Sequence, residues 1–308
     1  MEEENITTVT QFIILGFPEF PELQILFFLL FLLIYLIILM GNLTIITVTC
    51  LDPRLHTPMY FFLSNLSFLD ISYTSVTLPK LMDIFLRKSQ RISSVGCFSQ
   101  MYLFMVFLYV EFFLLTAMAY DRYVAICHPL RYTIIINERV SALMATGCWI
   151  FAFFVPVAAT VLTSHFSYCG SHVINHYFCD ISALMTLSCS STRVMEGMIV
   201  IFGTIIALPC FMTILISYIY IISAILRIRS SEGRRKAFST CSSHLTVVIL
   251  YYVSILCLYM RPTSKQTLDQ NKLIALLYNV FIPMFNPVIY SLKNKEVKAA
   301  LRKVFNRK

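Results

Sequence analysis

The sequence predicts an all-α membrane protein, a bundle of seven transmembrane helices. The chain has 308 residues, of which 58% are hydrophobic and only 13% are charged, and its mean hydropathy is +0.77. A soluble domain carries about 25% charged residues, so half that value indicates that most of this chain faces lipid. A spanning helix needs roughly 20 apolar residues. Seven stretches qualify, at about residues 23–50, 58–82, 93–121, 140–163, 197–226, 237–260 and 273–292.

These stretches are expected to be helices because a helix satisfies its own backbone in lipid, and the alternating pattern of barrel strands is absent. We therefore divide the chain into an N-terminal segment (1–22), a transmembrane domain (23–292) and a tail (293–308). The chain starts Met1-Glu2-Glu3-Glu4, which is acidic where a signal peptide needs a basic region. We expect the first helix to act as its own insertion signal.

The basic residues predict the orientation of the bundle. With the N-terminus outside, 16 of the 24 Lys and Arg residues fall on the cytoplasmic side, as the positive-inside rule requires. The net charge of +8 is then a property of the cytoplasmic face and not a signal for nucleic acid. Asn5 begins a glycosylation sequon on the outer side.

The tail is basic and carries apolar residues at helical spacing. That pattern predicts a short amphipathic helix on the inner leaflet, with an unstructured basic tail as the alternative. The apolar residues are Val297, Leu301, Val304 and Phe305.

Cysteines support the same topology. Four of the ten fall on the extracellular side, namely Cys97, Cys169, Cys179 and Cys189. Four cysteines in an oxidising compartment predict two disulfides, and spacing alone leaves three pairings open. Three of them lie in residues 164–196, a long polar loop of the kind that is usually functional or pinned in place.

Several motifs occur in a fixed order along the predicted helices. The first helix ends with Gly41-Asn42, and the second opens with the string PMYFFLSNLS from Pro58. The third ends with MAYDRYVAIC from Met118, and the sixth begins with KAFSTCSSHL from Lys236. The seventh ends with PMFNPVIY from Pro283.

Two of these elements, Asp-Arg-Tyr and Asn-Pro-x-x-Tyr, resemble those of rhodopsin-like G-protein-coupled receptors. The longer strings of helices 2, 3 and 6 resemble vertebrate odorant (olfactory) receptors, specifically the tetrapod-type class. The resemblance runs from about Phe12 to Arg302. It implies a receptor and not an enzyme. Such a receptor binds small volatile odorants and activates a stimulatory heterotrimeric G protein that raises cyclic AMP. It lies in the plasma membrane, in the cilia of olfactory sensory neurons.

The resemblance also implies which residues act in coupling. Arg122 would pair with Asp121 in one state and face the G protein in another, although a lone arginine there could equally reach lipid headgroups. Pro283 and Pro287 break the backbone ladder of helix 7 and allow it to bend. The full implied set is Asp121, Arg122, Tyr123, Tyr218, His244, Asn286, Pro287 and Tyr290.

For the cysteines, the resemblance implies a bridge from Cys97 to Cys179, and Cys169–Cys189 is then the second. His172 and His176 lie close to Cys179 in sequence and suggest a metal site. An oxidised cysteine cannot serve as a thiolate ligand, so we expect no metal there.

Asp70 and Glu111 are the only acidic side chains deep within the predicted membrane. Intramembrane carboxylates are costly and are candidates for function. If their helices face each other, the two must share a proton or a cation. In rhodopsin-like receptors the helix-2 Asp resembles a sodium-binding position, with Ser67 and Asn286 as further ligands. A protonated pair with a purely structural role is the alternative.

Apolar and aromatic residues in the outer halves of four helices form the candidate ligand pocket. They match positions that line the cavity of similar receptors, whereas ordinary interhelical packing is the alternative. No carboxylate lies in the outer half of helix 3, which disfavours an amine ligand and favours a small, mostly apolar one. The residues are Phe104, Met105, Leu108 and Tyr109 on helix 3, Phe202 and Ile206 on helix 5, Tyr252, Ile255 and Tyr259 on helix 6, and Asn279 on helix 7.

Other classes fit the sequence less well. A transporter is disfavoured because no inverted repeat is evident, and a membrane enzyme because no catalytic set clusters on one face. The nearest rival is a non-olfactory rhodopsin-like receptor for a lipid or another small ligand.

Overall fold

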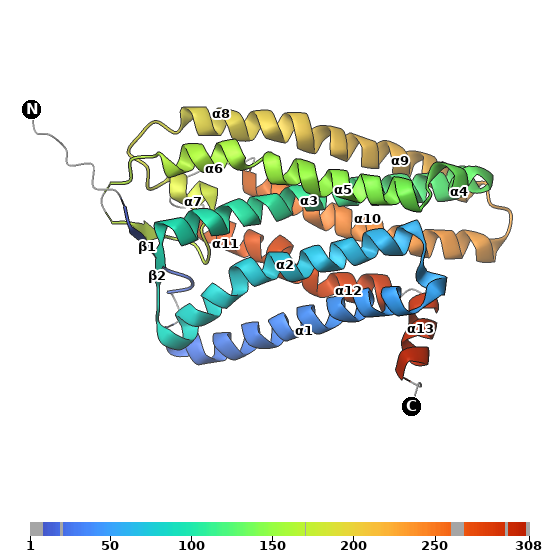
Figure 1. Cartoon of the computed structure of the whole chain (residues 1–308), viewed down its shortest axis with the longest axis horizontal. Helices are drawn as coiled ribbons and strands as arrows, with labels where there is room; N and C mark the ends of the chain where they lie inside the picture. Colours follow the sequence, from blue (N-terminus) through green and yellow to red (C-terminus); the bar gives the residue numbers. More distant parts are fainter. Residues whose placement is uncertain (1–8, 19–20, 170, 260–267, 293–294, 306–308) are drawn as a thin grey trace, which may run out of the picture.

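The computed structural model describes residues 9–18, 21–169, 171–259, 268–292 and 295–305. Within these residues the chain forms seven long helical segments that run alongside one another, with the two termini at opposite ends of the bundle (Figure 1). The predicted fold class is therefore confirmed.

The first three segments are single helices: α1 (Gln24–Leu51), α2 (Pro58–Arg87) and α3 (Ser94–Cys127). The fourth consists of α5 (Glu138–Phe154) and α6 (Val157–Ser164), and the short α4 (Tyr132–Ile135) precedes it. The fifth consists of α8 (Arg193–Phe202), a π-helical turn (Gly203–Ala207) and α9 (Leu208–Leu226). The sixth is α10 (Ser231–Tyr259). The seventh consists of α11 (Leu268–Leu276), a second π turn (Leu277–Phe281) and α12 (Ile282–Leu292).

Apart from the first, the helical segments are longer than the apolar stretches that predicted them. The third helix runs to Cys127 where the sequence predicted an end at 121, and the sixth begins at Ser231 where it predicted 237. An apolar stretch ends where polar residues begin, but the helix continues because polar residues face water at the membrane surface. The fourth segment is interrupted beside Pro156, since proline removes a backbone donor.

Six of the seven segments in the described part of the chain are long and apolar enough to cross a membrane. The remaining segment is α2, whose polar residues include Asp70 and several hydroxyl side chains. This helix packs against both α1 and α3, and Asp70 and Thr74 lie on its buried face. The polar residues of α2 therefore contact protein instead of lipid, which is how a membrane bundle tolerates them.

The tail forms the predicted helix, α13 (Lys295–Phe305), which turns away from the bundle axis at the end where the C-terminus lies (Figure 1). Val297 is buried against a cluster that includes Ile45 and Leu55, and Arg302 and Lys303 are exposed. The side chains of Val304 and Phe305 are not described. One face of α13 thus anchors it to α1, which supports the interpretation of the tail as an amphipathic helix.

A small sheet at the end of the bundle that carries the N-terminus was not predicted. It joins β1 (Gln11–Ile14), β2 (Arg91–Ser93) and β3 (Val173–Ile174) in the order β2-β1-β3. β1 pairs antiparallel with β2 and parallel with β3. The N-terminal segment is therefore fixed in place at β1, where Phe12 and Ile14 are fully buried.

The long loop also differs from the prediction, because part of it is core. Tyr177, Phe178 and Cys179 are fully buried, and a short helix, α7 (Ile181–Met185), follows them. Both predicted disulfides are present, with Cα–Cα separations of 5.4 Å for Cys97–Cys179 and 5.9 Å for Cys169–Cys189. The bridge to the start of α3 explains how this segment enters the bundle.

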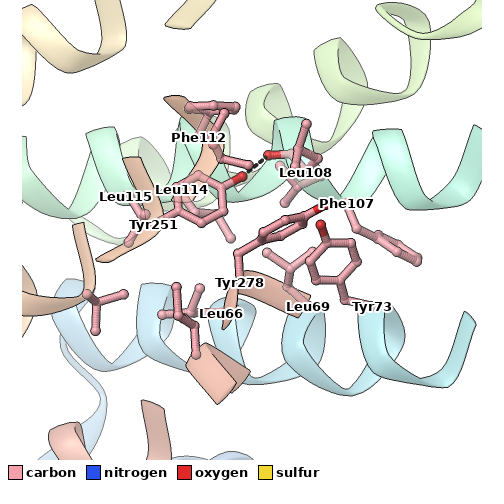
Figure 2. Close-up of a cluster of buried hydrophobic side chains, with 14 of the residues drawn as sticks. Leu66, Leu69, Tyr73, Phe107, Leu108, Phe112, Leu114, Leu115, Tyr251 and Tyr278 are labelled. Carbon is pink, nitrogen blue, oxygen red and sulfur yellow. Dashed lines mark hydrogen bonds between the residues drawn. The ribbon is translucent and has the colours of Figure 1, made fainter. Parts of the chain in front are cut away.

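The core between α2, α3, α10 and the seventh segment is built of large apolar side chains (Figure 2). Tyr73 of α2 lies 6.3 Å from Phe107 and 6.4 Å from Tyr278 between ring centroids. Figure 2 shows the hydroxyl of Tyr251 reaching the carbonyl of Leu108, to which it donates at 2.8 Å. This bond fixes α10 against α3 near the middle of the bundle.

Helices 1 and 7 meet where Pro287 interrupts the hydrogen bonding of α12. Because Pro287 has no N–H, the carbonyl of Pro283 lacks its helical donor, and the Asn42 side chain donates to that carbonyl at 3.2 Å. A Cβ at Gly41 would lie 3.0 Å from the ring of Pro287. Gly41 and Asn42 thus allow a proline-containing helix to pack closely without an unsatisfied carbonyl.

Candidate ligand-binding and coupling sites

Arg122 is held by its neighbour at the inner end of α3. Its Nη2 lies 2.5 Å from Oδ2 of Asp121, and its Nε donates to the same oxygen at 3.0 Å. The other carboxylate oxygen of Asp121 accepts a hydrogen bond from the hydroxyl of Tyr132 at 2.6 Å. Asp121 is buried, so both partners hold it in a fixed orientation. The sequence did not single out Tyr132, and no local motif marks it.

Tyr218 and His244 join the fifth and sixth segments beside this pair. The Tyr218 hydroxyl and Nδ1 of His244 are 2.7 Å apart, and the two rings stack. The charge of Arg122 acts on both side chains, so α3, α9 and α10 converge here. Tyr123 instead contacts His128, with its hydroxyl 3.2 Å from Nε2. Of the predicted coupling residues, Tyr123 is thus bonded away from the Arg122 cluster.

The α12 residues of the coupling set lie next to the buried carboxylates. Asn286 donates to Oδ2 of Asp70 at 2.9 Å, and Asp70 and Glu111 are close enough to interact electrostatically. Both carboxylates are almost fully buried. Oε1 of Glu111 and the hydroxyl of Tyr290 have no hydrogen-bond partner among the described residues. The structure thus joins Asn286 to Asp70 and places Glu111 near Asp70.

The predicted pocket residues of α3 have three different surroundings. Phe104 packs toward α2 and the loop, with its ring centroid 4.3 Å from that of Phe178 and 5.0 Å from that of Tyr73. Leu108 lies next to the sixth segment, where its carbonyl accepts a hydrogen bond from Tyr251, and Tyr109 contacts Phe112 within α3. Met105 packs with residues of the loop. The observed contacts of Phe104 are therefore packing contacts with α2 and the loop.

On α10, Tyr252 lies against α3 and α9. Its ring is 5.2 Å from Phe112 and 5.2 Å from Phe211, measured between centroids. Its hydroxyl is buried beside that of Thr116 and makes no hydrogen bond of good geometry within the described residues. The nearby hydroxyl of Thr116 donates elsewhere, to the carbonyl of Phe112 at 2.8 Å. A buried hydroxyl without a partner is costly, so a polar atom of a ligand would stabilise it.

Both π turns carry predicted pocket residues. Phe202 directly precedes the first turn and Ile206 lies within it, while Asn279 lies in the second. Single π turns inside α-helices occur frequently at functional sites. The Asn279 amide nitrogen donates to Oγ1 of Thr77 at 3.1 Å and to the hydroxyl of Tyr177 at 3.2 Å. Asn279 is thus bonded to α2 and the loop and is not joined to the α3–α10 group.

Two predicted residues lie outside what the structure describes. Asn5 precedes the first described residue, and the side chain of Tyr259 is not described. The predicted cation ligand Ser67 is buried on α2, on the face that carries Asp70.

The loop segment that enters the bundle contains a buried histidine. The His176 ring stacks on Tyr177 and packs edge-on against Phe178, near Asp180 and Lys272. Burial lowers the pKa of His176 to about 4, although Asp180 opposes the shift. Cys179 is in a disulfide, and no group of three metal-ligand side chains lies together among the described residues.

Acid is expected to destabilise the receptor through His176. The unfolded chain takes up a proton near pH 6.5, whereas the folded His176 resists it until about pH 4. The contribution of His176 to the free energy of unfolding is therefore fully present above pH 6.5 and is lost as the pH falls toward 4. At pH 5 the loss is about 2 kcal/mol. Thermal unfolding of detergent-solubilised receptor at pH 7.5 and pH 5 measures this. His176→Gln should show a smaller drop in melting temperature, and an equal drop would contradict the assignment.

A seven-helix bundle with an Asp-Arg pair at its cytoplasmic end is the architecture of a G-protein-coupled receptor. The sequence model of the olfactory receptor family matches residues 31–308. The mouse protein "Olfactory receptor 5AR1" is 46% identical over 308 residues, covering 100% of this chain and 99% of that relative. The human "Olfactory receptor 13D1" is 48% identical, covering 100% and 89%, and the mouse "Olfactory receptor 1E16" is 47% identical, covering 99% and 97%.

These matches show that the chain belongs to the olfactory receptor family. It is a multi-pass membrane receptor for odorants that couples to a G protein and is not an enzyme.

Proposed function

We propose that the receptor binds a small, neutral, mostly apolar odorant between α3, α9 and α10 and activates a stimulatory G protein that raises cyclic AMP. The observation that carries the ligand class is the apolar lining around the buried hydroxyl of Tyr252. The Tyr252 ring contacts Phe112 and Phe211, which carry no charge, so a permanently charged amine would not be compensated there. An oxygen atom of the ligand would form a hydrogen bond with the Tyr252 hydroxyl. The hydrocarbon part of the ligand would pack against the surrounding apolar side chains.

The affinity of such a ligand is expected to be micromolar. A volatile odorant has on the order of 10 heavy atoms, and small ligands gain between about −1.5 and −0.3 kcal/mol per atom. A middle value gives roughly −7 kcal/mol, close to the −8.2 kcal/mol that corresponds to 1 μM. With so little binding energy, the loss of one hydrogen bond should be visible in the dose response.

Tyr252→Phe should weaken the response to an oxygen-containing agonist by about fivefold, because one net hydrogen bond is worth about 1 kcal/mol. The response to a hydrocarbon of the same shape should change much less. A cyclic AMP reporter in transfected cells, with surface expression measured in parallel, gives both dose responses after an odorant screen has identified an agonist.

Tyr251→Phe is the matched control, because the Tyr251 hydroxyl is already bonded to the Leu108 carbonyl. Its loss should affect both ligand types alike, through stability and not recognition. Equal shifts for both ligands in Tyr252→Phe would refute the pocket assignment. A nanomolar peptide as the best agonist would instead favour the alternative of a non-olfactory receptor.

For coupling, we infer that activation releases Arg122 from Asp121 and that the G protein binds around it. The loop between α3 and α5 adds an apolar surface beside this pair, since Leu130 is 94% exposed and Ile134 is 74% exposed. Exposed apolar side chains of this size at the cytoplasmic end suit a protein partner. Helix 7 would move at Pro287, and Tyr218 and Tyr290 would turn toward the freed arginine.

Tyr132→Phe is expected to raise signalling without agonist by about two- to fivefold. The variant removes the hydrogen bond that holds Asp121, so the carboxylate binds Arg122 in a less fixed orientation. Basal cyclic AMP normalised to surface receptor measures the effect. Tyr123→Phe, which loses only a contact with His128, should leave basal signalling near the parent level. An unchanged basal level in Tyr132→Phe would show that the bond does not restrain Arg122.

Asp70 and Glu111 would hold either a sodium ion or a shared proton, with Ser67 and Asn286 beside them. The buried Oε1 atom of Glu111, which has no partner among the described residues, fits both occupants. Bound sodium would supply one positive charge, which offsets one of the two carboxylates, and a shared proton would neutralise one of them instead. We further infer expression in the cilia of olfactory neurons and glycosylation at Asn5.

A further inference from the structure

A cavity lies at the extracellular end, away from the residues predicted to bind the odorant. It measures about 240 Å³ and lies between the segment that follows β1, the start of α1 and the end of α2. Leu15 and Phe17 form one wall, and the buried side chains of Ile84 and Phe85 form the other. The cavity shares no residue with the predicted odorant pocket. Drug-sized ligands occupy roughly 300–1,000 Å³, so this cavity suits a smaller molecule.

One cation lines the mouth of this apolar cavity. Lys88 is exposed and makes no ion pair or side-chain hydrogen bond among the described residues. The acid nearest in sequence, Asp83, is already bound by Lys80 at 3.3 Å and Arg87 at 3.8 Å. Glu22 is exposed and does not line the cavity. The amide side chains of Gln24 and Gln90 add hydrogen-bond donors.

Lys88 is also held in an unusual backbone conformation. It ends α2 with φ of +54°, and it is the sole non-glycine residue with positive φ in the described part of the chain. Glycine is the residue that normally occupies this position at a helix end. A lysine there costs about 1 kcal/mol relative to glycine, and such strain tends to persist where a side chain has a task.

The cavity is connected to the loop that closes the bundle. The ring of Phe17 stacks on Phe85 with centroids 6.4 Å apart and on Tyr177 with centroids 5.9 Å apart. Tyr177 in turn is bonded to Asn279 in the π turn of the seventh segment. A molecule packed against Phe17 would therefore stabilise the loop and, through Asn279, one arrangement of helix 7.

We propose that this cavity binds a small anionic amphiphile, a monocarboxylate with a short alkyl chain, as a second ligand of the receptor. The carboxylate pairs with Lys88 and accepts hydrogen bonds from the glutamine amides. The alkyl chain packs between Phe17 and Phe85. A cation that has no ion pair among the described residues, together with an apolar floor, distinguishes this ligand from the proposed neutral odorant.

The test is a binding measurement that does not depend on signalling. The receptor has a single tryptophan, Trp149, on the fourth segment. A second tryptophan is introduced as Leu15→Trp, and receptor in phosphatidylcholine nanodiscs is titrated with 2-bromooctanoate, whose bromine quenches a nearby indole. We expect saturable quenching of the new tryptophan, whereas the parent protein reports only the linear background from partitioning into lipid.

Lys88→Gln in the Leu15→Trp background should weaken this binding at least tenfold, and the methyl ester of the acid should show only the linear background. Arg87→Gln is the matched control, because Arg87 is the neighbouring cation and does not line the cavity. Equal saturable quenching in Lys88→Gln, or no saturation in any variant, would overturn the proposal.

Two more measurements separate a bound carboxylate from damage by the new tryptophan and from a lipid headgroup. Octanoate should raise the melting temperature of the parent receptor, which carries no reporter, and should raise it less in Lys88→Gln. Adding phosphatidylserine to the nanodiscs should leave the bromooctanoate titration unchanged. If the anionic lipid abolished the saturable quenching, the site would belong to a lipid headgroup and the proposal would be wrong.

Discussion

Replacing Cys97 with serine is expected to remove most of the receptor from the cell surface. The bridge to Cys179 closes a loop of 82 residues, and both cysteines are fully buried. The chain-entropy model assigns roughly 4.5 kcal/mol to a loop of this length, which is comparable to the whole stability of many domains. The buried segment around Tyr177 and Phe178 would lose its covalent link to α3. Staining of an epitope-tagged receptor on intact cells, relative to the total, measures the loss.

Cys169→Ser is the graded comparison for this effect. The second bridge closes only 20 residues and should cost roughly 3 kcal/mol, so more receptor should reach the surface. Cys50→Ser is the control for cysteine loss itself, because Cys50 is a free thiol. The double variant Cys97→Ser/Cys179→Ser tests whether mispairing of the remaining cysteine causes the defect. Normal surface levels in Cys97→Ser would show that the bridge does not hold the fold together.

The helices were predictable from sequence because lipid leaves few alternatives. A run such as 23–50 has no acidic or basic residue, and in a bilayer only a helix satisfies its backbone. Helix ends were predicted less well, since Ser231–Lys236 is helical despite its charges. The sheet was missed because its strands are two to four residues long, too short for any alternating pattern to stand out.

Contacts within a sequence motif could be predicted at the candidate coupling site. Contacts between residues that are farther apart in the sequence could not. Asp121 and Arg122 are adjacent, so their pairing follows from the sequence itself. The bond from Tyr132 to Asp121 depends on how the following loop folds, and no periodicity predicts it. Asn279 was expected to face a ligand, but its bonds to Thr77 and Tyr177 depend on a loop that enters the bundle. That loop is buried and bridged to α3, and a hydropathy profile does not show which polar loop enters a bundle.

Arg122→Ala is expected to abolish agonist-dependent signalling, with at least a hundredfold loss of the cyclic AMP response, while surface expression stays close to the parent level. The Arg122 side chain is 15% exposed and is bound by Asp121, its neighbour in the chain. Its removal therefore breaks none of the hydrogen bonds that join two helices. Asp121 would keep its bond from Tyr132, which limits the cost of the unpaired carboxylate.

The loss of signalling follows because Arg122 is the cation where α3, α9 and α10 converge, between Asp121 and the Tyr218–His244 pair. Without it, the inner ends of these helices lose the charge that they would present to the G protein. Asp121→Asn provides the opposite test, since it weakens the restraint on Arg122 and should raise basal signalling. Agonist binding, measured by a thermal shift on purified protein, should persist in Arg122→Ala. A full response in a well-expressed Arg122→Ala receptor would mean that the arginine contacts lipid headgroups and has no part in coupling.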